Sequence, residues 1–394
     1  MFQHLKAQAP DPLLALIKQF RDDPRTDKLD LGVGVYRDTE GRTPVFRAMK
    51  GAERILLETQ ESKSYLGPEG DLRFVDLLKP IVFGPGDHGR ISGLQTPGGT
   101  GALRLAAELL ASAGPRRILV GEPTWPNHVP IFKAAGLEVV PYPYFDLSTQ
   151  SLRFDAMMEA LRQARAGDVV LLSGCCHNPT GADLSLDQWG EVAEFVSRSG
   201  LMPLVDFAYQ GLGRGLDEDA AGLRRMLATV DRVLVAYSCD KNFGVYRDRV
   251  GAVFAVAGDA AEAEVAQGNL ATLARVNWSM PPDHGGAAVR LVLDTPELKA
   301  DWHRELTEMC ARINAVRAAL AAEDPALAFL TRQRGMFSNL AVPKEVVAKL
   351  RADHGIYMAG SGRMNLAGLQ VSDAAAFVRG LRAVGALEQG ARAA

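Results

Sequence analysis

The sequence predicts an α/β protein, with a largely parallel sheet in a large domain and a smaller α+β domain beside it. Three observations carry this prediction. The chain has 394 residues, which is long for a single minimal core. Short apolar runs alternate with longer amphipathic stretches, as in repeated strand and helix units. From about Leu298 onward, the pattern changes to long helical stretches rich in alanine, leucine, glutamate and arginine.

The short apolar runs are the expected strands of the large domain. The helix between two of them has clear end signals, because Ser185 and Gln188 have capping-box spacing and Gly200 closes the segment. Alternation of strands with helices favours parallel neighbours in the sheet. The expected strands are residues 117–121, 137–142, 169–175, 201–207, 233–238 and 250–256.

The smaller domain is expected to combine both ends of the chain. A strand segment interrupts the C-terminal helical pattern between Phe329 and Val342. The first forty residues are too few to fold alone, so we expect them to pack against the C-terminal part. The predicted large domain is residues 41–299, and the small domain is residues 1–40 with 300–394.

Composition and charge favour a cytoplasmic protein that acts on small molecules. Hydrophobic residues make up 47% of the chain, and 44 basic against 47 acidic residues give a net charge of -3. Without a long basic run, we expect no nucleic-acid partner. Because no apolar stretch approaches about 18 residues and no secretory leader is recognisable, we expect no membrane segment.

The four cysteines are expected to be reduced core residues. Cys175 and Cys176 are adjacent, and Cys239 and Cys310 stand apart, so no pair has the spacing of a zinc site. We therefore predict no metal.

A glycine-rich turn, Pro97–Gly101, precedes a stretch with helical apolar spacing. Backbone N–H groups at a helix N-terminus attract anions, so a phosphate group would fit there. Taken alone, the turn is equally a simple tight turn. Its glycine spacing differs from the dinucleotide fingerprint, and no strong strand is recognisable before it.

Polar side chains follow three consecutive expected strands, at the sheet edge where open α/β sheets bind ligands. Singly, each has an ordinary alternative: a capping residue for Asp206, an exposed amine for Lys241. Together they supply an amine, an acid for a ring nitrogen, and donors for a phenolate and a phosphate, which a phosphorylated pyridine aldehyde requires. The residues are Asn178, Asp206, Tyr209, Ser238, Lys241 and Arg249.

These residues lie in sequence blocks that resemble the class I aminotransferases of the aspartate and aromatic amino acid group. The blocks are TPGGTGALR, PTWPNH, GCCHNPTG, DFAYQG, SCDKNFG and GSGRMN, in this order. The resemblance runs over almost the whole chain. It implies the fold type I of pyridoxal-phosphate-dependent transferases, a pyridoxal 5'-phosphate cofactor and a homodimer with shared active sites.

The resemblance assigns roles around the cofactor ring. Lys241 holds the cofactor covalently and then moves a proton between the substrate α-carbon and the cofactor. Asp206 pairs with the pyridinium nitrogen, Asn178 and Tyr209 donate to the phenolate oxygen, and Trp125 stacks on the ring. The phosphate shell it implies is Gly99, Thr100, Ser238 and Arg249, completed by Tyr65 of the neighbouring subunit.

The resemblance also implies a substrate site that includes Trp125 and Asn178. Arg363 binds the α-carboxylate, a bidentate task for which arginine is better suited than lysine. Arg275 reaches across the dimer to a distal carboxylate, and Gly34 leaves room for the substrate.

Two positions depart from the family pattern. Asp240 directly precedes Lys241, where the family usually has serine. A carboxylate there would repel a phosphate dianion, so this side chain is expected to turn away from the phosphate or to hold a bridging group. Ser173 stands where many relatives have histidine, so His128 is expected to support Asp206 with less help.

The predicted function is transfer of an amino group from an aromatic or dicarboxylic amino acid (Tyr, Phe, Trp, Asp) to 2-oxoglutarate, by a ping-pong mechanism. Trp278, Met280 and Phe337 are expected around the side-chain pocket, although all three also suit ordinary packing. One alternative is a strict aspartate aminotransferase. A lyase or a non-catalytic module of the same fold is disfavoured, because both substrate arginines and the lysine are present.

Overall fold

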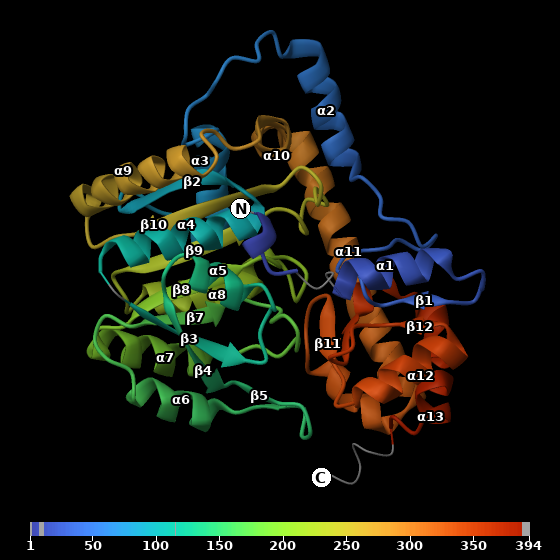
Figure 1. Cartoon of the computed structure of the whole chain (residues 1–394). Helices are drawn as coiled ribbons and strands as arrows, with labels where there is room; N and C mark the ends of the chain where they lie inside the picture. The colour runs from blue at the N-terminus through green and yellow to red at the C-terminus, as the bar shows by residue number, and fades with distance from the viewer. Residues whose placement is uncertain (1, 8–11, 115, 388–394) are drawn as a thin grey trace.

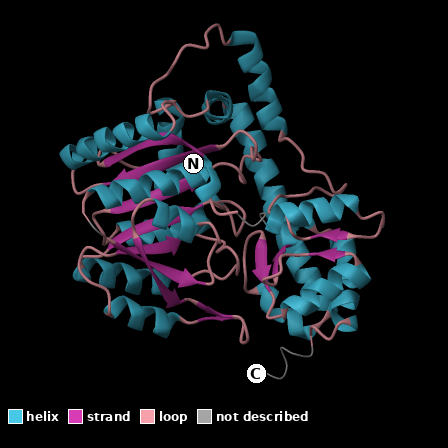
Figure 2. Ribbon diagram, viewed as in Figure 1, coloured by secondary structure: helices cyan, strands magenta, loops and turns pink. Residues whose placement is uncertain are grey.

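The computed structural model describes residues 2–7, 12–114 and 116–387. Figures 1 and 2 show a larger lobe built on a sheet with helices on both faces, and a smaller lobe beside it. In the described part of the chain, none of the helices has the length and apolar character needed to cross a membrane.

A seven-stranded sheet forms the centre of the larger lobe. All neighbouring strands are parallel except β10, which runs antiparallel to both of its neighbours. The six predicted strands are confirmed within two residues, and the largely parallel sheet is confirmed with them. In spatial order the strands are β2 (Ile91–Pro97), β10 (Val250–Val256), β9 (Val233–Ser238), β8 (Met202–Phe207), β7 (Val169–Ser173), β3 (Arg117–Glu122) and β4 (Glu138–Pro143).

Strand β2 was missed by the sequence analysis, and the statement that no strong strand precedes the glycine-rich turn is wrong. Its sequence, ISGLQTP, carries few apolar residues, so it lacks a strand pattern of its own. The strand is stabilised by pairing with its neighbour, because all seven residues of β2 are in register with the fully buried β10.

Side chains on alternate residues of each strand enter two different apolar cores. Leu204 belongs to the core that includes the helices α4, α5 and α9, whereas Val205 belongs to the core on the opposite face. Because both faces are covered, β9 is buried at every residue. The helices of the larger lobe are α2 (Arg47–Thr59), α3 (Leu72–Phe83), α4 (Gly98–Ser112), α5 (His128–Ala134), α6 (Phe154–Arg162), α7 (Leu186–Ser199), α8 (Leu216–Leu227), α9 (Ala260–Asn277) and α10 (Asp283–Asp294).

Helix α7 begins and ends as predicted. The Ser185 hydroxyl accepts from the Gln188 N–H at 3.1 Å, and the Gln188 side chain accepts from the Ser185 N–H at 2.9 Å. At the other end, Gly200 has φ of +64°, a conformation that glycine adopts without steric cost.

The smaller lobe joins the two ends of the chain. Strand β1 pairs in parallel with β12, so that Leu29 lies opposite Ile356. A third apolar core contains Leu31 and residues between 316 and 386. The remaining elements are η1 (Phe2–His4), α1 (Pro12–Asp22), β1 (Leu29–Asp30), α11 (Pro296–Glu323), η2 (Pro325–Thr331), β11 (Phe337–Asn339), α12 (Lys344–His354), β12 (Ile356–Tyr357), β13 (Arg363–Asn365), η3 (Leu366–Gly368), η4 (Val371–Asp373) and α13 (Ala374–Ala383). A short hairpin in the larger lobe pairs β5 (Phe145–Asp146) with β6 (Ser151–Leu152).

Helix α11 is shared between two cores. Trp302 and Ile313 lie in the core that faces the sheet, whereas Val316 and Leu320 lie in the core of the smaller lobe. The predicted boundary at residue 299 therefore falls inside one continuous 28-residue helix. In Figure 1 this helix runs from the top of the molecule down into the smaller lobe.

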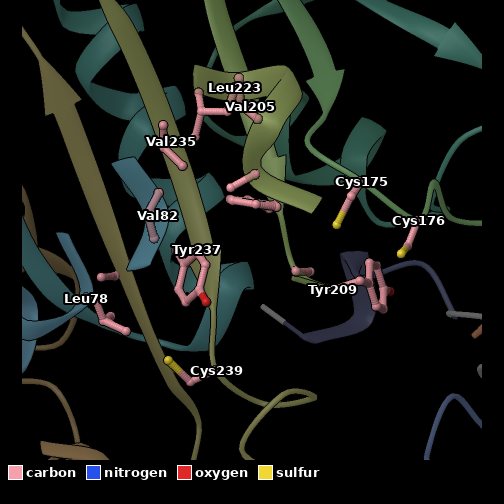
Figure 3. Packing of buried hydrophobic residues seen from close by; sticks show 14 of the residues in the cluster. Leu78, Val82, Cys175, Cys176, Val205, Tyr209, Leu223, Val235, Tyr237 and Cys239 are labelled. Atoms are coloured by element: carbon pink, nitrogen blue, oxygen red, sulfur yellow. The ribbon is translucent and has the colours of Figure 1, made fainter. Parts of the chain in front are cut away.

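The four cysteines are buried and form no disulfide bond with one another, which confirms that they are core residues. Figure 3 shows Cys175 and Cys176 in the packed interior near Tyr209. The carboxylate of Asp219 lies within 4.8 Å of both sulfurs, but it accepts three backbone N–H groups at 2.9 Å. Burial raises the pKa of the Cys175 thiol well above its usual range, so this group is held in the neutral form.

Arg317, on α11, is a fully buried cation. Its guanidinium donates to backbone carbonyls of the following segment, including Gly335 at 2.7 Å and Phe337 at 2.6 Å. It also donates to the carbonyl of Leu330 at 3.4 Å. Of the predicted strand segment between Phe329 and Val342, only the three residues of β11 form a strand, and Phe329 lies in the 3-10 helix η2.

We predict that Arg317→Met destabilises the protein by about 3 kcal/mol, because several buried carbonyls would lose their donor. Urea unfolding at one fixed protein concentration measures this. Arg304→Met, on the same helix, is the matched control: Arg304 forms an exposed pair with Asp301, and its loss should change stability by about 0.5 kcal/mol or less. Equal midpoints for the two variants would show that the Arg317 bonds contribute nothing net.

Candidate active site

The carboxyl ends of three adjacent parallel strands bring the predicted ring-binding residues together. Asn178 follows β7, Asp206 is the next-to-last residue of β8 and Tyr209 follows that strand, and Lys241 follows β9. The Asn178 side-chain amide donates to the Tyr209 hydroxyl at 3.1 Å, and the Lys241 ammonium nitrogen lies 5.7 Å from the centre of the Tyr209 ring. A pocket at this edge is lined by Asn178, Asp206, Tyr209, His128 and other residues.

Lys241 is the amine of this group. Burial lowers the pKa of its side chain below the ordinary 10.5, and the negative charges of Asp240 and Asp206 oppose that shift. The Asp240 carboxylate lies 3.9 Å from the lysine nitrogen. A larger neutral fraction makes this amine a better nucleophile and base near neutral pH than an ordinary lysine.

Asp206 is held by a chain of hydrogen bonds. His128 Nε2 donates to the Asp206 carboxylate at 3.0 Å, and the other ring nitrogen of His128 pairs with the Thr124 hydroxyl at 2.7 Å. The predicted support of Asp206 by His128 is therefore present. Trp125 meets the His128 ring edge-on, with the ring centres 5.3 Å apart. Thr124 was missed, although its position four residues before His128 was the available signal.

Helix α4 begins directly after β2 and forms a narrow cradle. Gly98 has φ of +69°, and a Cβ at Gly99 would lie 3.0 Å from the Ser238 Cβ. The Arg249 side chain also reaches this helix end, because a Cβ on Gly98 would lie 2.5 Å from its Nη2. Thr100 is in the same first turn. A helix N-terminus with a hydroxyl and a guanidinium beside it suits a phosphate group.

Asp240 lies against this cradle rather than turning away from it. It is 2% exposed, accepts from the Arg249 guanidinium, and accepts from the Val250 N–H at 3.2 Å. The expected repulsion between Asp240 and a phosphate is thus offset in part by the adjacent Arg249 charge.

Arg363, on β13, lies beside an aromatic ring in the smaller lobe. Its guanidinium carbon is 4.8 Å from the centre of the Phe337 ring, and Nη2 donates to the Gly32 carbonyl at 3.0 Å. Its Nε is buried without a partner, which leaves donor capacity for a ligand. A Cβ on Gly34 would lie 2.8 Å from Phe337, so this position requires a small residue.

Tyr65 and Arg275 are not brought to this group by the described residues of one chain. Tyr65 is 90% exposed. Arg275 is also exposed, and it bonds the Ser279 hydroxyl at the end of α9. Nearby, the Met280 sulfur accepts from the Leu66 N–H at 3.2 Å, and Trp278 packs against the core of α4 and α9. The assignment of Tyr65 and Arg275 to the active site of a neighbouring subunit stays a prediction.

The arrangement matches a known family. The family model of aminotransferases of class I and II matches residues 26–381. This chain belongs to that family. Aminotransferases of this family use pyridoxal phosphate, and the residues present fit this cofactor. Lys241 supplies an amine, and Asp206 supplies a carboxylate. Asn178 and Tyr209 offer two donors for the ring oxygen of the cofactor, and the cradle at α4 suits its phosphate.

Similar proteins cover almost the whole aminotransferase chain. This chain is 55% identical to a tyrosine aminotransferase of Rhizobium meliloti (strain 1021) over 380 aligned residues. The aligned residues cover 95% of this chain and 98% of that relative. This chain is 43% identical to an aspartate aminotransferase of Escherichia coli (strain K12), over 98% of this chain and all of that one. The predicted fold type I is confirmed by the solved aromatic-amino-acid aminotransferase of Burkholderia pseudomallei with covalently bound pyridoxal phosphate, which has 37% identity and a TM-score of 0.94 over 98% of this chain and 99% of that one.

We predict that Lys241 in the cofactor-free aminotransferase reacts with acetic anhydride with a pH midpoint below 10.5. Only the neutral amine reacts, and burial disfavours the ammonium form, so the neutral form appears at lower pH than for an ordinary lysine. Mass spectrometry of the Lys241 peptide across a pH series gives the midpoint. Asp240→Asn should lower it further, since the lost negative charge favoured the ammonium. A midpoint at or above 10.5 would contradict the argument.

Proposed function

We propose that this aminotransferase moves the amino group of aromatic and dicarboxylic amino acids to 2-oxoglutarate in a ping-pong cycle. The observation that carries the substrate class is Arg363, a partly unpartnered guanidinium held beside the Phe337 ring. A guanidinium binds a carboxylate in a bidentate manner, and an adjacent ring offers apolar surface to a side chain. Relatives named for tyrosine, for aromatic amino acids and for aspartate support both substrate classes.

We assign the proton transfer to Lys241. When bound, pyridoxal phosphate supplies an electron sink for the charge left on the substrate α-carbon. The Lys241 amine would remove the α-proton of the substrate and return a proton on the cofactor side. Asp206, held by His128, would keep the pyridine nitrogen protonated, and Asn178 and Tyr209 would donate to the ring oxygen. Trp125 would cover one face of the ring.

The phosphate and the substrate complete the site. We assign the phosphate to Gly99, Thr100, Ser238 and Arg249, with Tyr65 of the partner subunit. The α-carboxylate is assigned to Arg363 beside Gly34, Trp125 and Asn178, and a distal carboxylate to Arg275 of the partner subunit. A phenylalanine side chain would instead use the surface of Trp278, Met280 and Phe337, where full burial offers about 1.5–3 kcal/mol.

The site as assigned requires a homodimer, because the described residues of one chain leave Tyr65 and Arg275 exposed. We further propose that residues 41–299 act as a large domain and that residues 1–40 with 300–394 act as a small domain that closes over the substrate. Arg363 would move with the small domain. Helix α11 would bend between Ile313 and Val316, where it leaves one core and enters the other. Four unpaired cysteines suit the reducing cytoplasm, where we place the enzyme.

Covalent attachment at Lys241 gives a direct test. Borohydride reduction of the purified enzyme, followed by peptide mapping, should place a reduced cofactor on Lys241 alone. Lys241→Ala should lower transamination by several orders of magnitude, because no other described residue at this sheet edge supplies an amine to the reacting carbon. A reduced cofactor on a different lysine would refute the assignment.

The proposed substrate range predicts a split effect of Arg275→Leu. The variant should lower kcat/KM for aspartate by at least about a hundredfold, because a distal carboxylate loses its partner charge, and should leave phenylalanine within about threefold of wild type. Steady-state assays with 2-oxoglutarate as acceptor measure both values. A wild-type enzyme that uses aspartate but has no measurable rate with phenylalanine or tyrosine would favour a strict aspartate aminotransferase.

The subunit origin of Arg275 is checked by mixing. Lys241→Ala and Arg275→Leu subunits, each poorly active with aspartate, should regain aspartate activity after exchange, because one site of each mixed dimer has both native residues. No recovery after verified exchange would place Arg275 outside a shared site.

A further inference from the structure

Asp240 places a buried negative charge at the position proposed for the cofactor phosphate. Its carboxylate accepts from the guanidinium of Arg249 and from the backbone N–H of Val250 at 3.2 Å. The Asp240 side chain is 3% exposed, whereas that of Arg249 is 40% exposed. The carboxylate therefore lies inside the cradle, and the arginine closes over it from the solvent side.

The same carboxylate also reaches the first residue of α4. A Cβ on Gly98 would lie 3.0 Å from the Asp240 Oδ2 and 2.5 Å from the Arg249 Nη2. The N-terminus of α4 carries unpaired N–H groups and the positive end of the helix dipole, which attract one anion strongly. Asp240 thus pairs with the guanidinium that would hold a phosphate, and it lies close to the helix end that would also attract one.

Charge balance shows the consequence for ligand binding. Arg249 is neutralised by Asp240 before any ligand arrives, and the remaining nearby cation is Lys241, 3.9 Å from the same carboxylate. A phosphate that enters the cradle must share Arg249 with Asp240 and lies close to a second negative charge, with low water access to screen it. An uncharged side chain at residue 240 would impose neither cost.

We propose that Asp240 is an internal competitor of the cofactor phosphate: it stabilises the cofactor-free enzyme through Arg249 and weakens the binding of the phosphorylated cofactor. This inference rests on the proposed function, since it assumes that the cradle at α4 holds the phosphate. It deepens that function by making the cofactor exchangeable. Without the cofactor, Arg249 and the helix end keep an anionic partner, so the empty site does not carry unpaired positive charge.

The test compares two ligands that differ only in the phosphate. Cofactor-free wild type, Asp240→Asn and Asp248→Asn are titrated with pyridoxal phosphate and with pyridoxal, by calorimetry or by quenching of tryptophan fluorescence. Asp248→Asn is the matched control, because it removes one carboxylate from the same segment, while the Arg249 guanidinium bonds Asp240 and the Tyr246 carbonyl.

We expect Asp240→Asn to bind pyridoxal phosphate at least about tenfold more tightly than wild type, which corresponds to about 1.4 kcal/mol. The gain in affinity for pyridoxal should be clearly smaller, because the altered Lys241 amine acts on both ligands whereas the freed Arg249 acts only on the phosphate, and Asp248→Asn should match wild type for both ligands. The thermal midpoint of the cofactor-free form should fall in Asp240→Asn, because Arg249 loses its partner. Inorganic phosphate should raise that midpoint more in the variant than in wild type.

Equal or weaker binding of pyridoxal phosphate by Asp240→Asn would overturn the proposal, since it would show that Asp240 positions Arg249 for the phosphate instead of competing with it. An equal gain for pyridoxal would also overturn it. If Asp240→Asn does not fold, Asp240→Ser gives the same comparison with a smaller side chain. A failure of every variant and of wild type to bind pyridoxal phosphate would instead refute the proposed function itself.

Discussion

Parallel pairing of β7, β8 and β9 is the constraint on which the site depends. Strands that run the same way end at the same edge, so Asn178, Asp206 and Lys241 meet although they are far apart in the sequence. The pairing is itself held by burial on both faces, through two apolar cores that use alternate residues of each strand. A shift of one residue in any of these strands would exchange its two faces and remove its polar end from the group.

The charged side chains of Asp206, Asp240 and Arg317 are each stabilised in a different manner. Asp206 relies on the ring of His128, whose orientation is fixed by Thr124. Asp240 relies on a cation, Arg249, and on a backbone N–H. Arg317, deeper in the protein, relies on backbone carbonyls. Only the second of these arrangements contains a cation that the cofactor phosphate would also need, so of these three groups only Asp240 would compete with that phosphate.

Much of the site was predictable from sequence, because short motifs fix local geometry. Polar residues at the ends of apolar runs indicated the shared edge, and capping signals placed α7 correctly. Strand β2 escaped detection since its stability comes from its partner β10 and not from its own residues. The bonds of Arg317 to the carbonyls of the segment before and at β11 join residues 13 to 20 positions apart and leave no local signal in the sequence. Likewise, the pairing of Asp240 with Arg249 joins positions nine residues apart through a turn that the sequence alone does not define.

Helix α11 has a consequence for how the molecule unfolds. Its 28 residues span about 42 Å, and its two halves complete two different cores. Melting of either half would remove packing surface from both lobes, since a helix loses its hydrogen bonds cooperatively. The shared helix therefore couples the packing of the two lobes, although they look separate in Figure 1. A gentle bend of the helix preserves this packing on both sides, because curvature strains its hydrogen bonds only slightly.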